Sequence, residues 1–259
     1  MVNFNISVSE LEYFLLILMR IATFVYIAPF FGMSGVPSRV KIGLSLLLAY
    51  LVYKIMPAQY PEYETVLGYA IIVLKESATG LLIGFFANIC MSILNFAGNI
   101  SDMETGLSMV TLMDPQTKES VTITGNYYTY VITLMLMISG MYQYILFALV
   151  ESFDLIPVNG AIFNTENILS GMLKFMADYL SIGFRICLPI VCIMLLLNSV
   201  LGILAKVSPQ MNMFAVGMQI KILVGLGTMF LVVGLLPKVS TLILNEMKQM
   251  ITLIIEALS

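Results

Sequence analysis

Five ionisable residues lie inside long apolar stretches of this sequence, where an unpaired charge is costly. They are Arg20, Lys75, Glu76, Arg185 and Lys221. A charged side chain at the middle of a bilayer is penalised by ~2.5–3.5 kcal/mol even on a lenient scale, so each of these residues needs a partner. One interpretation is a transport path or a proton relay. The interpretation that we favour is that neighbouring subunits supply carboxylates, carbonyl groups or water.

The sequence offers little for enzymatic chemistry. It contains no histidine, which excludes an imidazole base, HExxH peptidases and Ser–His catalysis. Lys75 and Glu76 are adjacent and so face different sides of a helix, and Glu76 is the only clearly intramembrane carboxylate. Cys90, Cys187 and Cys192 lie in apolar runs at no ligand-like spacing. We therefore expect no catalytic site, no cofactor and no metal site.

The composition is typical of an integral membrane protein. Of the 259 residues, 60% are hydrophobic and only 10% are charged, and the mean hydropathy is +0.99; about 25% charged residues is usual in soluble domains. The net charge of −3 gives no basic face for a nucleic acid. We expect a membrane partner and no nucleic-acid partner.

The apolar runs predict an all-α protein with about six long, kinked helices. The third run, Val66–Ala97, is longer than one span and must tilt or protrude, and Pro189 should kink the fifth. The tail Lys238–Leu258 has helical apolar spacing, which predicts an amphipathic helix. The six predicted spans are Leu11–Phe31, Val40–Met56, Val66–Ala97, Tyr127–Val150, Tyr179–Ala205 and Met213–Leu236.

Two features of these spans predict contacts with other helices. Gly80 and Gly84 form a GxxxG pattern that allows close helix packing, and Asn198 places an amide inside the fifth span. Lys and Arg in the connecting segments are evenly divided between the two sides, so the positive-inside rule does not fix the orientation.

The segment Gly98–Gly125 lies between two apolar runs but is itself unlike a span. It carries five charges and is interrupted by Gly106, Pro115 and Gly125. Loose backbone and charges cannot face lipid, and a loop of this length between packed helices is usually functional or disordered. The segment also has apolar surface to bury, at Leu107, Met109, Val110, Leu112 and Met113. We interpret it as a mobile seal inside a membrane-embedded assembly.

Several strings of residues occur together in one known family, and they run in order along nearly the whole chain. The two specific ones are GLS…DP and PQMNMFAVG, and with them this sequence resembles the FliR/SctT family of type III export-gate proteins. The matching strings are RVKIGL (Arg39–Leu44), ESATGLLIGF (Glu76–Phe85), GLS (Gly106–Ser108) with Asp114–Pro115, Leu188–Pro189, Asn198 with Gly202, and PQMNMFAVG (Pro209–Gly217).

The resemblance implies a single export-gate domain over residues 1–259. Residues of about 1–176, including a plug loop at 98–125, would be FliP-like, and about 177–259 would be FliQ-like. The chain would assemble with FliP and FliQ homologues, and further with FlhB and FlhA homologues, around a pore for exported flagellar proteins. Its place would be the bacterial inner membrane, at the flagellar basal body.

The resemblance also assigns roles to residues. The plug falls at about Gly106–Thr122, and where many relatives carry paired Phe this chain has the thinner side chains of Met109–Met113. The residues alone leave a second hypothesis open, a stand-alone secondary transporter or ion channel. The plug residues are Gly106, Leu107, Ser108, Met109, Val110, Leu112, Met113, Asp114 and Pro115; the expected subunit contacts are Arg20, Lys75, Glu76, Gly80, Gly84, Arg185, Asn198 and Lys221.

Overall fold

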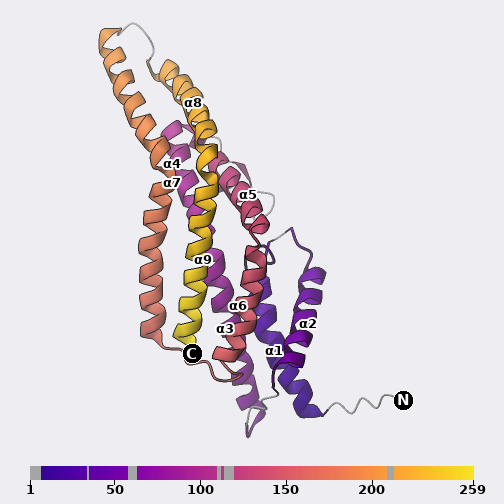
Figure 1. Cartoon of the computed structure of the whole chain (residues 1–259). Coiled ribbons are helices and arrows are strands. Elements are labelled where there is room, and N and C mark those ends of the chain that lie inside the picture. The colour runs from indigo at the N-terminus through magenta and orange to yellow at the C-terminus, as the bar shows by residue number, and fades with distance from the viewer. Residues whose placement is uncertain (1–6, 34, 58–62, 110–111, 114–119, 209–212) are drawn as a thin grey trace. The chain divides into compact units, whose positions relative to one another are not determined.

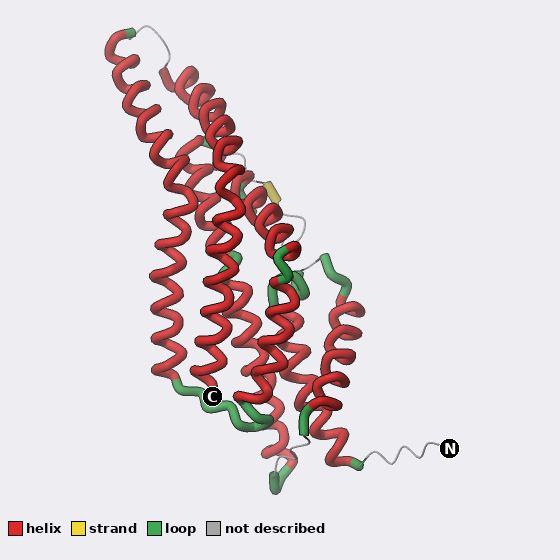
Figure 2. The backbone as a smooth tube through the Cα atoms, in the orientation of Figure 1, coloured by secondary structure: helices red, strands yellow, loops and turns green. Residues whose placement is uncertain are grey.

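The computed structural model describes residues 7–33, 35–57, 63–109, 112–113, 120–208 and 213–259. Within these ranges the chain is built from helices, joined by short turns and one small pair of strands (Figures 1 and 2). The prediction of an all-α, membrane-type protein is therefore confirmed.

Nine α-helices account for most of the described residues. The α-helices are α1 (Val8–Ile27), α2 (Ser38–Ile55), α3 (Val66–Ile89), α4 (Ser92–Thr105), α5 (Ile123–Ile138), α6 (Met141–Leu155), α7 (Thr165–Val207), α8 (Met213–Val232) and α9 (Leu236–Leu258). Single 3-10 turns are η1 (Leu107–Met109) and η2 (Val233–Leu235), and the strands are β1 (Leu112–Met113) and β2 (Ser120–Val121).

The predicted number of six spans is not confirmed. Among the described residues, three stretches are long and apolar enough to cross a membrane, Val66–Thr105, Thr165–Val207 and Val216–Leu258, and the bent pair α5–α6 would make a fourth. α1 and α2 do not qualify, because each carries three charged residues in 20 or fewer.

Two apolar runs that we predicted as single spans are interrupted. The run Val66–Ala97 contains all of α3 and the start of α4, with a turn at Cys90–Met91. The run Tyr127–Val150 contains α5 and α6, separated at Gly140, which has a φ of 75°. At Gly140 a left-handed residue separates two helices without any change in hydropathy, so the apolar pattern did not reveal that break.

The chain forms two compact units, each made from separated stretches of sequence. The first contains residues 1–89, 140–175 and 246–259, and the second contains residues 90–139 and 176–245. The family resemblance implies a different division, into a FliP-like part up to about residue 176 and a FliQ-like part after it. That division rests on similarity to other proteins, not on contacts within this chain, and it remains a prediction.

In the first unit, α1 packs closely against α3. A Cβ atom added to Gly80 would overlap the carbonyl oxygen of Arg20, and one added to Gly84 would lie 3.1 Å from the carbonyl oxygen of Phe24. The absence of side chains at these two positions lets the helix backbones approach. The GxxxG pattern is thus used within the chain, whereas we had expected it at a subunit contact.

The predicted amphipathic tail is confirmed as α9. Its predicted apolar positions are buried at Ile243, Met247, Met250, Ile251 and Ile254, while Thr252 and Glu256 on the other side are exposed.

Candidate functional site

The first candidate site is a buried ion pair in the first unit. The guanidinium of Arg20 on α1 lies against the carboxylate of Glu76 on α3, with 2.6 Å between Nε and Oε2. Both side chains are fully buried. The close α1–α3 packing at Gly80 brings the two residues together, because Gly80 is one turn beyond Glu76 and touches the backbone of Arg20.

The two remaining guanidinium nitrogens of Arg20 donate hydrogen bonds to carbonyl groups at the end of α6. Its Nη1 donates to the carbonyl oxygens of Ile156 at 2.9 Å and Ser152 at 3.4 Å, and Nη2 donates to that of Pro157 at 3.5 Å. The last carbonyls of a helix lack partners within the helix and form the negative end of its dipole. Arg20 therefore caps the C-terminus of α6.

The carboxylate of Glu76 and the face of the guanidinium are also occupied. Oε1 of Glu76 accepts a hydrogen bond of 2.9 Å from the backbone N–H of Asn159. The Arg20 guanidinium carbon lies 4.3 Å from the centre of the Phe153 ring, within range of a cation–π contact. The pair thus joins α1, α3 and the end of α6 into one network.

This network differs from the predicted role of the two residues as subunit contacts. Their partners come from the same chain, and neither side chain is exposed for a neighbouring subunit to touch. Sequence spacing could not show this, because Arg20 and Glu76 are 56 residues apart and meet only through the packing of α1 on α3.

The other predicted contact residues lie elsewhere and are more accessible. Arg185 on α7 is exposed, and Lys75, Asn198 and Lys221 are half-buried. Among the described residues, none forms an ion pair with Lys75, Arg185 or Lys221. For these four residues the role of subunit contact remains a prediction.

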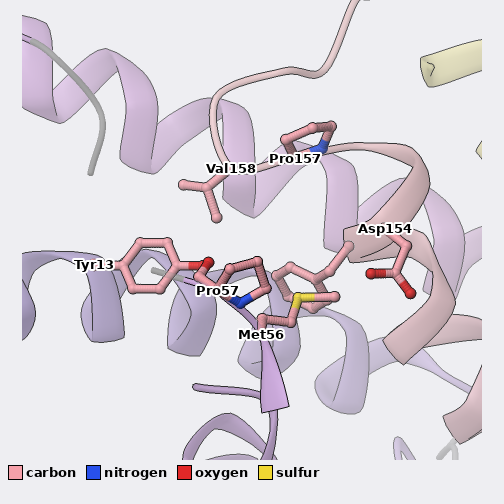
Figure 3. Close-up of a pocket in the computed structure, with 7 residues that line it drawn as sticks. Tyr13, Met56, Pro57, Asp154, Pro157 and Val158 are labelled. Carbon is pink, nitrogen blue, oxygen red and sulfur yellow. The ribbon is translucent and has the colours of Figure 1, made fainter. Parts of the chain in front are cut away.

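A small cavity lies next to the Arg20 network, and two of its lining residues, Phe153 and Pro157, belong to that network. Its volume of about 80 Å³ is below the ~300–1,000 Å³ of ligand pockets and has room for a few water molecules. The hydroxyl of Tyr13 donates to the carbonyl oxygen of Pro57 at 3.3 Å on its wall. Figure 3 shows the lining residues, which are Tyr13, Met56, Pro57, Phe153, Asp154, Pro157 and Val158.

The second candidate site is the central segment in the second unit. The predicted loop of 98–125 is wrong at both ends, because α4 continues to Thr105 and α5 begins at Ile123. Gly106 ends α4 with a φ of 82°, a conformation that favours glycine. The connection proper is therefore Gly106–Thr122, and we call it the gating segment.

Only part of the gating segment lies within the described residues. Leu107 is buried and Ser108 is half-buried, both in η1. The strands β1 and β2 pair antiparallel, with Leu112 opposite Val121 and Met113 opposite Ser120. Val110, Asp114 and Pro115 lie outside the described residues, as do the side chains of Met109, Leu112 and Met113, so the predicted apolar surface of the plug remains a prediction.

The two helices that flank the gating segment, α4 and α5, contact one another next to it. A Cβ atom added to Gly98 on α4 would overlap the backbone of Gly125 on α5. The hydroxyl of Thr122 donates to the side-chain oxygen of Asn99 at 2.9 Å, and that of Thr129 donates to the side-chain oxygen of Asn95 at 3.0 Å. We call these facing parts of α4 and α5, residues 95–102 and 122–129, the neck.

Asp102 is the buried charge of the neck. Its carboxylate accepts a hydrogen bond of 2.9 Å from the backbone N–H of Thr124 and another from the Thr124 hydroxyl. Thr124 is in the first turn of α5, whose N-cap residue Thr122 makes no side-chain cap. Asp102 therefore caps α5 from a neighbouring helix and sits at the positive end of its dipole.

This capping role could not be predicted from the sequence. In the sequence, Asp102 is one of five charges in a segment that Gly125 interrupts, whereas in the structure both residues lie in helices. A cap supplied by another helix leaves no local sequence pattern, since Asp102 and Thr124 are 22 residues apart. Within the described ranges, no group of three His, Cys, Asp or Glu residues is placed to hold a metal ion.

Comparison with known proteins matches nearly the whole chain to one family. The family is described as "Bacterial export proteins, family 1", and the match covers residues 11–247. The flagellar biosynthetic protein FliR of Bacillus subtilis (strain 168) is 30% identical over 214 residues, 82% of each chain.

Two further relatives carry the same name. FliR of Borreliella burgdorferi is 29% identical over 236 residues, 86% of this chain and 83% of its own. FliR of Escherichia coli (strain K12) is 25% identical over 218 residues, 82% of this chain and 80% of its own.

Proposed function

Because this chain belongs to the bacterial export proteins of family 1, we propose that it is a structural and gating subunit of the flagellar type III protein-export channel. The observation that carries the proposal is the gating segment, held between α4 and α5 by the neck, in a chain similar to FliR over most of its length. The chain acts in the bacterial inner membrane, in the flagellar basal body.

The partners follow from the family resemblance. The chain assembles with FliP and FliQ homologues, and with FlhB and FlhA homologues, around a pore that exported flagellar proteins pass through. The gating segment closes this pore at rest. The proposed role requires no catalytic site. The matched relatives are named flagellar biosynthetic proteins.

The apolar residues of the gating segment suit a seal inside a protein-lined pore. Burying a side chain such as Leu or Met stabilises by roughly 1.5–3 kcal/mol, and ordering the backbone around it costs about 1–2 kcal/mol per residue. The balance is small, so a closed segment of this composition can both limit leakage and give way to a substrate.

A deletion tests this role. Removing Leu107–Met113 should leave the complex with FliP and FliQ homologues recoverable and raise its conductance for ions after reconstitution. A second variant, in which the same positions carry Gly and Ser, keeps the length of the segment and removes its apolar side chains. It should leak as well, because the seal depends on those side chains.

The same measurement can reject the proposal. Unchanged conductance in a normally assembled deletion complex would show that the segment does not close the pore. Ion conductance by the purified chain alone would favour the alternative of a stand-alone channel or transporter.

A further inference from the structure

We propose that the neck is a fixed clamp, which stays closed while the channel transports, and that Asp102 is its positioning residue. The inference rests on the proposed function, because it concerns how the gating segment is held. It assigns a role to a buried carboxylate outside both the Arg20 network and the apolar part of the gating segment.

The first observation is the contact between the two backbones. At Gly98 and Gly125 no side chain separates α4 from α5, and even a methyl group on Gly98 would not fit. Glycine is unfavourable inside a helix, so two glycines facing one another in two helices point to a need for close approach. Such a contact has no room for small rearrangements, because tightly packed elements have few intermediate positions.

The second observation is the ladder of polar contacts along the same interface. Thr122 donates to Asn99, Thr124 donates to Asp102, and Thr129 donates to Asn95. Each bond joins α4 to α5, and together they cover two turns of each helix. The gating segment therefore leaves and enters the same clamp.

The third observation is the burial of Asp102. Its side chain is fully buried, and among the described residues no cation forms an ion pair with it. The first turn of α5 supplies its hydrogen-bond donors and the positive end of a helix dipole. Opening the neck would remove these donors from a buried carboxylate, which is one of the most unfavourable changes in a protein interior. The clamp is thus stable only when closed.

A reversible link across the neck tests whether it must open. Asn99 is exposed and its partner Thr122 is half-buried, so Asn99→Cys and Thr122→Cys can be bridged by a short bis-thiosulfonate reagent that a reductant removes. The background chain has Cys90, Cys187 and Cys192 replaced by alanine. We expect the bridged complex to export flagellar substrates as well as the reduced complex does.

The matched controls are the two single-cysteine chains treated with the same reagent. Export that falls about tenfold on bridging, and returns with reductant only in the double variant, would overturn the inference, because the neck would then have to open.

Substitution of Asp102 tests its positioning role. Asp102→Ala leaves the N–H of Thr124 without its acceptor, and we expect the resting conductance of the complex to rise about tenfold, as for the loss of one charge-assisted hydrogen bond. Asp102→Asn keeps one acceptor oxygen, so the conductance of this variant should lie between those of the wild-type and the Asp102→Ala complexes. Bridging Asn99→Cys to Thr122→Cys in the Asp102→Ala chain should restore low conductance, which a general loss of stability would not allow.

Two outcomes of these substitutions would overturn the role of Asp102. One is wild-type conductance in an assembled Asp102→Ala complex, and the other is a leak that bridging does not reduce. If Asp102→Ala cannot be recovered, Thr124→Val and Thr124→Ser decide instead. The serine variant keeps the hydroxyl donor and should stay closed, whereas the valine variant should leak; equal conductance in both would contradict the proposal.

Failure of this inference can be told from failure of the proposed function. If deletion of Leu107–Met113 causes no leak, the gating function itself is wrong. If that deletion leaks but bridging the neck stops export, the segment gates the pore and only the fixed clamp is wrong.

Discussion

At the scale of single residues, the network around Arg20 shows how a membrane-type protein holds a charge in its interior. A buried ion pair rarely adds net stability, since desolvation offsets the attraction, but removing one member leaves an uncompensated charge. Here the guanidinium also serves the last carbonyls of α6, and Glu76 also accepts from Asn159. Both residues therefore stabilise the ends of elements as well as each other.

Substitutions in the pair should be costly singly and less costly together. Glu76→Leu and Arg20→Met should each destabilise by about 3–5 kcal/mol. The double variant Arg20→Met/Glu76→Leu should regain part of this loss, though not all of it, because the α6 carbonyls and the Asn159 N–H still lose their partners. Thermal unfolding of the purified complex measures these effects.

The exposed Arg39 on α2 offers a matched control. Arg39→Met should change stability by no more than about 0.5 kcal/mol. A double variant that is as unstable as the sum of the two single variants would show that Arg20 and Glu76 do not depend on each other.

At the scale of elements, the α1–α3 contact depends on two glycines with different surroundings. A methyl group at Gly80 would meet the backbone oxygen of Arg20, which cannot move without shifting α1. At Gly84 the nearest atom is 3.1 Å away, so a small shift is enough. The same pattern thus contains one strict and one tolerant position.

Alanine substitutions should separate these positions. Gly80→Ala should destabilise by about 1–3 kcal/mol through overpacking, and Gly84→Ala should cost less. Gly43→Ala is the control, because nothing lies within 4 Å of an added Cβ there, and it should be neutral or stabilising by up to about 1 kcal/mol. Equal losses at Gly80 and Gly84 in thermal unfolding would contradict the close contact at Gly80.

At the scale of the whole molecule, the helix α7 is much longer than the hydrocarbon core of a bilayer is thick. α7 has 43 residues, or about 65 Å at ~1.5 Å per residue, while the hydrocarbon core is ~30 Å thick. Its exposed residues include Leu180, Phe184 and Leu188, with Arg185 among them. Part of this surface therefore suits contact with other protein subunits.

Removal of the accessible charges should affect assembly before conduction. Arg185→Leu and Lys221→Met should lower co-purification with FliP and FliQ homologues, because a charge on an apolar surface needs a partner group. The control is Lys174→Met, an exposed lysine on the same helix as Arg185, which should not lower recovery. Normal recovery with abolished ion flux in the Lys221→Met variant would instead support an ion path.

The sequence by itself determined the membrane-type helical class, the amphipathic α9, the unusual character of the central segment and the family. These features are local or compositional: hydropathy, the helical period and short motifs are properties of neighbouring residues. The sequence also identified Arg20 and Glu76 as charges that need partners, because the cost of a charge in an apolar run does not depend on the fold.

Only the tertiary structure decided which groups those partners are. Arg20 meets Glu76 and the end of α6, Asp102 caps α5, and Gly98 touches Gly125. Each of these contacts joins residues at least 22 positions apart, and each depends on how two helices pack. Packing direction is set by the sum of many small contacts, which no short stretch of sequence contains. For that reason only the structure revealed the partners of Arg20 and Glu76 within the chain, and the neck.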